Sequence, residues 1–161
     1  MIHNKHAYVD RFGGVYEHSA WVAELAFGMG PPEPYDLPAI MRKIVEDAGE
    51  EAQLTLLRAH PDLAGKLAKS GDLTQESTTE QASAGLDQCT EEEFATFTDL
   101  NAKYKSRFGF PYILAVKGRH RTEILENFSA RIDNAPEVEF REALDQVHQI
   151  ATLRFKDLFG Q

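Results

Sequence analysis

The segment that begins at Pro136 has the most regular apolar pattern in the chain. Its apolar side chains recur at the spacing of one helix face, at Phe140, Leu144, Val147, Ala151 and Leu158. Proline is favoured at the first helical position, so the pattern predicts one long helix from Pro136 to the end of LRFKDLF. An amphipathic helix is stable in water when other elements cover its apolar face. The pattern therefore favours a packed helical domain.

Helix start signals recur along the rest of the chain. A Ser or Thr can cap a helix by accepting a backbone N–H, and proline suits the first turn. Such signals predict helices that begin near Ser19, Pro38, Ser77, Thr90 and Thr122. Ser77 and Thr90 each precede a glutamate by three residues, which is the capping-box pattern.

Helix stop signals complete the pattern. His60 precedes Pro61, and a residue before proline is pushed out of the helical region, so a helix over 50–60 should end there. A short helix over 62–69 is expected next. Gly109 and Pro111 should end the helix that begins at Thr90, and the apolar run YILAV after them should be a buried extended piece. The sequence thus predicts an all-α, single-domain bundle of about eight helical pieces with one irregular apolar segment.

Length and charge narrow the function. At 161 residues the chain has the length of one domain, and we expect a single domain over 1–161. Hydrophobic residues make up 42% and charged residues 27%, which is typical of folded globular proteins. The formal net charge of -9 repels nucleic-acid phosphates and anionic membranes. We therefore expect no nucleic-acid or membrane partner, and an anionic substrate would need a local cationic site.

Cysteine usage and targeting signals indicate a reducing compartment. Cys89 is the only cysteine, which excludes an internal disulfide and a thiolate zinc cluster. MIHNKHAYVDRF has no apolar signal core, and no run approaches the length of a membrane span. The ending LFGQ is not a peroxisomal address. We expect a cytoplasmic protein.

His60 is the first candidate for chemistry, and two interpretations of it are open. A histidine at a helix end is favoured in its positive form by the last carbonyl groups, which is a structural role. A rigid His-Pro turn would also hold an imidazole in one orientation, and a ring that titrates near neutral pH is suited to general acid catalysis. Asp62 is placed either to orient this ring or to cap the next helix.

Polar side chains gather at the expected helix start near Ser77. Glu80, the fourth residue of the capping box, either bonds back to the Ser77 amide or takes part in ligand binding. In the second case the side chains and free helix N-terminal amides of this turn would hold a polar planar ligand. The residues concerned are Glu76, Ser77, Thr78, Thr79, Glu80 and Gln81.

Arg154 lies on the apolar stripe of the last helix, where an unpaired charge is costly. Its guanidinium either reaches past the helix end to water or faces inward as a bidentate anchor for a carboxylate. The second interpretation fits an anionic substrate better.

Other motifs are absent or weak. The remaining histidines show no metal-ligand spacing, and no nucleophile elbow, P-loop or dinucleotide fingerprint occurs. We expect no metal and no cofactor. His148 is expected to be a partly exposed structural residue, and KGRHR is either a solvated turn or a patch that steers phosphate or carboxylate groups.

Three stretches, RAHPDLAGKLA, LTQESTTEQASAGLD and RFGFPYILAVKGR, together resemble the 2-oxo-4-hydroxy-4-carboxy-5-ureidoimidazoline (OHCU) decarboxylases of urate breakdown. FGGVYEHSAWVAE and QVHQIATLRFKDL are also similar to that family. The five stretches occur in the family's order and cover nearly the whole chain. One departure is Ala20, where many relatives have proline, and it lies away from the inferred site.

The resemblance implies an all-α homodimer that forms (S)-allantoin without a cofactor or metal. It implies that His60 is the catalytic acid and that Pro61 lines the site. Arg154 matches an arginine that either anchors an anionic or carbonyl group or orders the Glu80 turn. The implied substrate contacts are Ser77, Thr78, Thr79, Glu80 and Gln81, with mainly backbone contacts from Tyr112, Ile113, Leu114, Ala115 and Val116.

The chemistry of such a reaction agrees with the motifs. Loss of CO2 leaves an electron pair that the heterocycle can delocalise into its own carbonyl, so no pyridoxal or thiamine is required. Glu80 and Gln81 are expected to hold the ureido group, and backbone groups of 113–116 to stabilise the developing charge. Two alternatives remain open: a non-catalytic all-α interaction domain of the same ancestry, and a hydrolase in which Glu80 activates water on a ureido or amide substrate.

Overall fold

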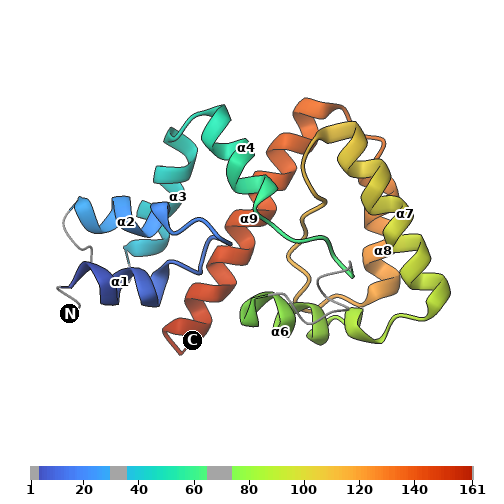
Figure 1. Ribbon diagram of the computed structural model, residues 1–161, viewed down its shortest axis with the longest axis horizontal. Helices are drawn as coiled ribbons and strands as arrows, with labels where there is room; N and C mark the ends of the chain where they lie inside the picture. The colour runs from blue at the N-terminus through green and yellow to red at the C-terminus, as the bar shows by residue number, and fades with distance from the viewer. Residues whose placement is uncertain (1–3, 30–35, 65–73, 161) are drawn as a thin grey trace. The chain divides into compact units, whose positions relative to one another are not determined.

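Eight α-helices and one short 3-10 helix form the described part of the chain, which comprises residues 4–29, 36–64 and 74–160 of a computed structural model (Figure 1). No strand occurs within these residues, so the predicted all-α fold is confirmed. The chain divides into two compact units, one made of Met1–His60 with Val147–Gln161 and the other of Pro61–Gln146. We call them unit 1 and unit 2 and describe each by itself.

Unit 1 contains four short helices and the C-terminal part of the last one. They are α1 (Lys5–Phe12), α2 (Trp21–Gly28), α3 (Leu37–Asp47), α4 (Glu50–Arg58) and α9 (Pro136–Leu158). Helix α2 packs against both α1 and α3. In α3, Leu37, Met41 and Val45 are buried at successive i+4 positions and form its inward face. The Phe12 and Phe155 rings, 6.3 Å apart, join α1 to α9.

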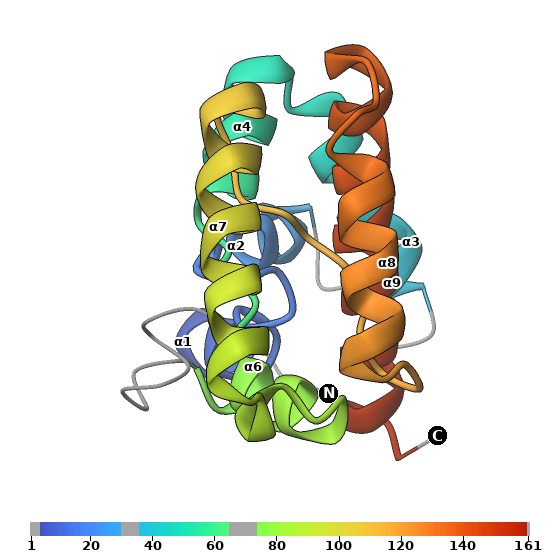
Figure 2. The same cartoon turned by 90° about the vertical axis from the view of Figure 1, so that its right-hand side faces the viewer.

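Unit 2 contains α6 (Gln75–Ser83), the 3-10 helix η1 (Leu86–Gln88), α7 (Glu91–Phe108), α8 (Arg121–Arg131) and the first part of α9. Helices α7 and α8 pack against each other and both stand upright in Figure 2. Their contact includes the Tyr104 and Phe128 rings, whose centroids are 5.8 Å apart. The predicted capping box of Thr90 and Glu93 opens α7, and Gly109 closes it with a left-handed φ of 80°.

The irregular apolar segment lies where the sequence predicts it. No helix or turn is formed over 111–116, and every residue of this run is buried. Its backbone polar groups therefore need partners other than a helix or a sheet. Side chains of unit 2 supply some of these partners, as described below.

Three helices begin near their predicted positions, but the predicted residue is not the N-cap. Ser19 does not cap α2, because its hydroxyl donates to the Glu17 carbonyl at 3.0 Å. Helix α6 begins after Thr74, whose hydroxyl accepts the Ser77 N–H at 3.2 Å, so Ser77 is inside the helix. Helix α8 begins after His120, whose side chain accepts the Thr122 N–H.

The short helix expected over 62–69 lies mostly outside the described residues. Its described part, up to Ala64, is not helical, and Ala64 has a positive φ of 51°.

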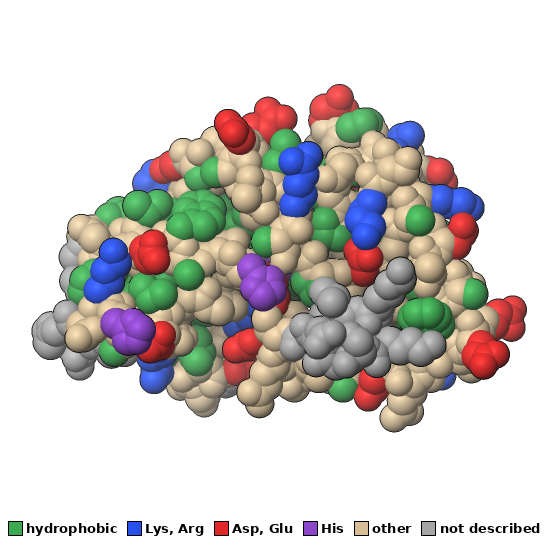
Figure 3. All heavy atoms as spheres, viewed as in Figure 1, with side chains coloured by type: hydrophobic (Ala, Val, Ile, Leu, Met, Phe, Trp, Pro, Cys, Tyr) green, Lys and Arg blue, Asp and Glu red, His purple; other side chains and the backbone are tan. Residues whose placement is uncertain are grey.

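Acidic and basic side chains are interspersed on the face drawn in Figure 3. Several of them form exposed i,i+4 pairs along the helices, such as Lys43 with Asp47 and Arg141 with Asp145. These pairs contribute little to stability because water and salt screen them. Among the described helices none combines the length and the apolar character that a membrane span requires.

Candidate active site

His60 of unit 1 follows directly on the C-terminal end of α4. The helix ends at Arg58, and the His60 N–H still bonds to the Leu57 carbonyl at 3.2 Å. The ring Nδ1 lies 3.0 Å from the Leu56 carbonyl oxygen. A carbonyl only accepts, so Nδ1 carries the hydrogen and Nε2 has the lone pair when the ring is neutral. The helix stop before Pro61 thus fixes both the position and the tautomer of the ring.

The environment of His60 favours its neutral form. The side chain is only 8% exposed, and this burial lowers the pKa of His60 from 6.5 to about 4. The Leu56 carbonyl and the Glu17 carboxylate oppose this shift in pKa, whereas Arg154 and His18 add to it. We expected titration near neutral pH, but in the unliganded chain the ring is neutral at pH 7. The sequence does not reveal this because it does not show how deeply the ring is buried.

Arg154 and Glu17 form a buried ion pair in the same unit. Arg154 Nη2 lies 2.9 Å from Glu17 Oε2, and the two side chains are 5% and 1% exposed. Arg154 Nη1 also donates to the Gly14 carbonyl at 2.9 Å. The guanidinium therefore turns inward rather than reaching past the helix end to water. Through Glu17 it belongs to the group of charges that acts on His60.

Glu17 is a residue of interest that the motif search did not single out. It lies in the irregular stretch between α1 and α2, where no periodic pattern marks a buried position. Its neighbour His18 has a positive φ of 50°, which is uncommon for a residue other than glycine. The only signal in the sequence was that Glu17 falls within FGGVYEHSAWVAE, one of the stretches that carry the resemblance.

His148 is more buried than expected. It is 2% exposed, and its Nδ1 lies 2.9 Å from the Tyr16 hydroxyl. The Glu46 carboxylate approaches its other ring nitrogen at 3.6 Å. The ring borders a small cavity of about 130 Å³ in unit 1, together with Tyr16, Pro38, Ala39, Arg42, Ala151, Thr152 and Phe155.

In unit 2, the polar residues of the Ser77 stretch lie on the body of α6 instead of forming a turn. Ser77 and Gln81 are four residues apart on one face and both are 5% exposed. Thr78 and Thr79 face outward, and Glu80 is half-buried. The N-cap of α6 is Thr74, three residues before the expected Ser77. The N-terminal amides of the helix therefore come before these side chains in the chain.

Gln81 holds the backbone that follows Pro61. Its side-chain oxygen accepts the Ala64 N–H at 3.0 Å, and its nitrogen donates to the Asp62 carbonyl at 3.4 Å. The Asp62 carboxylate pairs with Lys105 Nζ at 2.8 Å, and this ion pair involves neither an imidazole nor a helix N-terminus. Within unit 2, Gln81 thus joins α6 to the backbone of Asp62 and Ala64.

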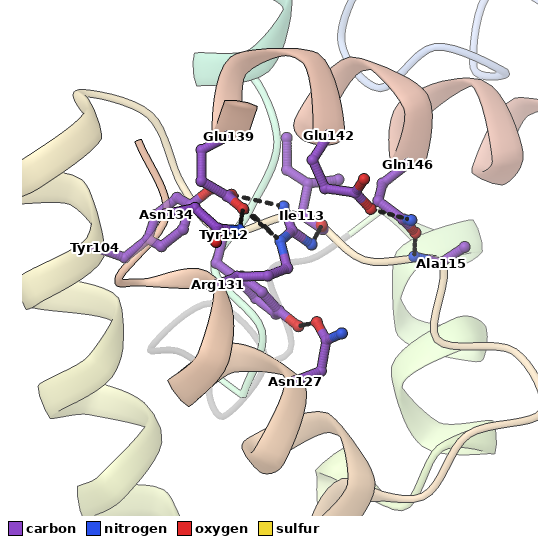
Figure 4. A network of polar contacts seen from close by, with 10 residues as sticks. All are labelled: Tyr104, Tyr112, Ile113, Ala115, Asn127, Arg131, Asn134, Glu139, Glu142 and Gln146. Carbon is purple, nitrogen blue, oxygen red and sulfur yellow. Dashed lines mark hydrogen bonds and ion pairs between the residues drawn. The ribbon is translucent and has the colours of Figure 1, made fainter. Parts of the chain in front are cut away.

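The apolar segment is held by a network of polar side chains from α8 and α9 (Figure 4). Arg131 Nη1 donates to the Ile113 carbonyl at 2.7 Å, and its other nitrogens bind the Glu139 carboxylate at 3.0 to 3.2 Å. Gln146 accepts the Ala115 N–H at 2.9 Å. Arg131, Glu139 and Gln146 were not predicted as site residues, because the sequence does not show which side chains face an irregular segment.

The described residues contain no group of three or more His, Cys, Asp or Glu side chains that could hold a metal ion. Within them, two sets of side chains have the features of a reaction site. Unit 1 holds a buried, neutral imidazole beside a buried ion pair. Unit 2 holds a buried backbone segment fixed by side-chain hydrogen bonds. Of the two, the imidazole of unit 1 is the group suited to acid–base chemistry.

Comparison with known proteins identifies the family. The model of the OHCU decarboxylase family matches residues 3–156, and the chain belongs to this family. A 2-oxo-4-hydroxy-4-carboxy-5-ureidoimidazoline decarboxylase of Haloferax volcanii is 46% identical over 96% of this chain and 90% of its own length. The mouse decarboxylase of the same name is 35% identical over 95% of this chain and 86% of its own.

One further relative is a longer protein, and another is known from its crystal structure. A uric acid degradation bifunctional protein of Bacillus subtilis is 39% identical over 94% of this chain, which spans 30% of that protein. A crystal structure of (S)-allantoin synthase matches 96% of this chain with a TM-score of 0.74 and 32% identity, and this chain spans 50% of that one. The fold and the sequence thus agree on the same family.

Proposed function

We propose that this protein catalyses the decarboxylation of OHCU to (S)-allantoin in urate breakdown, with His60 as the proton donor. The observation that carries the proposal is the family match over residues 3–156, with a decarboxylase 46% identical across 96% of the chain. The buried imidazole held at the end of α4 supports the role of His60.

The reaction requires one bond to break and one net proton to be added. The bond between the ring carbon and the carboxylate breaks, CO2 leaves, and the electron pair shifts into the adjacent C=N bond, so that the ring nitrogen takes up a proton and an enol forms. A proton then adds to one face of the ring carbon that bears the ureido group, while the enol hydroxyl loses its proton and its carbon becomes a carbonyl; two protons are gained and one is lost. Addition to a single face gives a single enantiomer of allantoin. The protein must therefore hold the ring and present one acid to one face.

His60 is suited to this task once the substrate is bound. Its Nδ1–H is held by the Leu56 carbonyl, so the exchangeable proton is carried on Nε2. Burial keeps the pKa of His60 at about 4 without ligand. A substrate carboxylate beside Nε2 would raise that pKa, because an opposite charge favours the protonated ring. The imidazole would then gain a proton when the anionic substrate binds, and it would deliver this proton to the substrate's ring carbon after CO2 leaves.

The remaining assignments follow the family's motifs. Pro61 lines the site, and Ser77, Thr78, Thr79, Glu80 and Gln81 contact the ureido group and the polar edge of the ring. Tyr112, Ile113, Leu114, Ala115 and Val116 contact the substrate mainly through their backbone, and the backbone groups of 113–116 stabilise the developing negative charge. The Ala115 N–H is engaged by Gln146, so this charge would have to be met by the neighbouring backbone groups. Arg154 acts through Glu17, whose carboxylate it holds beside His60.

The proposal extends to the protein in the cell. We place it in the cytoplasm as a homodimer that binds a small molecule and uses no cofactor. Its sedimentation velocity at micromolar concentration tests the assembly, since a monomer of 18.1 kDa is easily distinguished from a dimer.

The function is tested with freshly generated OHCU and a record of optical rotation. Faster appearance of one allantoin enantiomer, with release of CO2, supports the decarboxylase. Racemic product at the uncatalysed rate would instead indicate an interaction domain of the same ancestry. Release of ammonia or carbamate products would indicate a hydrolase in which Glu80 activates water.

A further inference from the structure

The apolar segment of unit 2 is tied to its surroundings at successive points. The Tyr112 ring stacks on Phe128 with 3.8 Å between centroids and 7° between planes, and its hydroxyl donates to Asn127. The Arg131 guanidinium carbon lies 4.6 Å from the Tyr112 ring centroid. Figure 4 shows the Tyr112, Asn127 and Arg131 side chains close together at the start of the segment. Side-chain contacts of Tyr112 therefore fix the N-terminal part of the segment, in addition to any hydrogen bonds of its backbone.

The two backbone groups tied by side chains belong to alternate residues. Arg131 binds the carbonyl of Ile113, and Gln146 binds the N–H of Ala115. The run 111–116 forms no helix, turn or bend, and none of its residues has a positive φ. In an extended backbone of this kind, the polar groups of residues i and i+2 point to one side and those of residues i+1 and i+3 to the other. The polar groups of Leu114 and the N–H of Val116 are thus expected on the edge opposite to the Ile113 carbonyl and the Ala115 N–H.

That opposite edge carries two buried donors. Leu114 is 3% exposed and Val116 is 4% exposed. Within the described part of the chain, neither of their N–H groups donates a hydrogen bond. Buried backbone N–H groups nearly always find a partner, and an unsatisfied one is costly. A pair of such donors on one edge is suited to an oxyanion.

Gln146 is itself held in one orientation. It is 5% exposed, and its side-chain nitrogen donates to Glu142 Oε1 at 2.9 Å. Since a carboxylate accepts and cannot donate, this bond forces the side-chain oxygen of Gln146 toward Ala115. Glu142, Gln146 and the Ala115 amide therefore form a directed chain of hydrogen bonds.

We infer that Gln146 is a positioning residue for the reaction: its hydrogen bond to Ala115 sets the edge of the segment so that the Leu114 and Val116 N–H groups face the negative charge that develops on the substrate ring. This inference rests on the proposed function. It adds a residue on α9 that does not touch the substrate and assigns the charge-stabilising role to two particular amides. Preorganised donors of this kind act mainly on the transition state.

The test compares three variants in the optical-rotation assay. Gln146→Leu has similar volume but cannot accept the Ala115 N–H, and we expect kcat to fall about 10- to 100-fold with KM changed less than about threefold. Gln149→Leu, on an exposed position of the same helix, should match the wild type. The double variant Glu142→Gln with Gln146→Glu exchanges donor and acceptor between the two positions, restores both hydrogen bonds and should recover kcat to within about threefold.

Circular dichroism and thermal unfolding show which variants are folded, and kcat is expressed per folded protein. If Gln146→Leu does not fold, the smaller Gln146→Ala, which also cannot accept the Ala115 N–H, takes its place.

A folded Gln146→Leu enzyme with unchanged kcat would overturn the inference, as would a double variant whose kcat is no higher than that of Gln146→Leu. Loss of folding with normal kcat per folded molecule would show a structural role alone and would also overturn it. A wild-type protein without OHCU decarboxylase activity would contradict the proposed function instead, so the two failures are distinguishable.

Discussion

Each unit ties an irregular segment to α9 or α8 through a buried arginine that also binds a buried glutamate. In unit 2, Arg131 binds Glu139 and donates to the Ile113 carbonyl. In unit 1, Arg154 binds Glu17 and donates to the Gly14 carbonyl. All four charged side chains are at most 6% exposed. Each unit therefore contains a buried arginine that binds both a buried glutamate and a backbone carbonyl.

The two pairs differ in where the carboxylate lies. Glu139 is on a helix, its carboxylate also accepts from Tyr104 and Asn134, and it is 0% exposed. Glu17 lies in the irregular segment itself and acts on the charge state of His60. The pair of unit 2 is thus a scaffold that holds a backbone segment, whereas the pair of unit 1 also acts on the pKa of His60. Equal burial does not imply an equal role.

Removal of the scaffold carboxylate should have the largest effect on stability. Glu139→Ala leaves the Arg131 guanidinium buried without its counter-charge, and we expect the free energy of unfolding to fall by about 3–5 kcal/mol in urea titration. Glu137→Ala, exposed on the same helix, should change it by less than about 0.5 kcal/mol. A loss below about 1 kcal/mol for Glu139→Ala would show that the pair is not a scaffold.

The lowered pKa of His60 predicts a pH dependence of stability in unit 1. The folded ring binds its proton only near pH 4, whereas the unfolded ring does so near 6.5. Between these values the unfolded state holds more protons, so stability falls as the pH is lowered, by about 3 kcal/mol in total. The difference in unfolding free energy between the wild type and His60→Gln should follow this course. A difference that stays constant from pH 7 to 4.5 would contradict the burial of a neutral ring.

Glu17→Gln should have a smaller effect on stability than Glu139→Ala but a distinct effect on chemistry. Glutamine keeps an acceptor for Arg154, so we expect a loss of about 1–3 kcal/mol. Because Glu17 raises the pKa of His60, its neutralisation should lower that pKa further and reduce kcat. An NMR titration of the His60 ring, with exposed Glu24→Gln as control, checks this. An unchanged pKa of His60 would show that Glu17 does not act on this ring.

Much of the fold could be predicted because local chemistry decides it. Thr90 and Glu93 satisfy each other's backbone donors, and Gly109 and Pro136 suit the backbone angles at their helix ends. The start of α6 could not be predicted in the same way. Thr74 and Ser77 both offer a hydroxyl, and only packing, which buries Ser77 and Gln81 on one face, selects the earlier start.

The sequence supplies the candidate residues of the site but not their electrostatics. The His60–Pro61 pair and the stripe around Arg154 are visible in the sequence. The pKa of His60 depends on burial and on Glu17, which is distant along the chain and has no periodic signal. Gln146 and Arg131 escaped notice for a related reason, since their partners are backbone atoms of a segment without regular structure.

The central claim is that His60 delivers the proton that makes (S)-allantoin, and His60→Gln tests it most directly. The variant should remain folded, lose about 10²–10⁴-fold in kcat/KM, and leave optically inactive product at the uncatalysed rate. His6→Gln, at an exposed position, should match the wild type. A folded His60→Gln enzyme that still forms one enantiomer at the wild-type rate would contradict the claim.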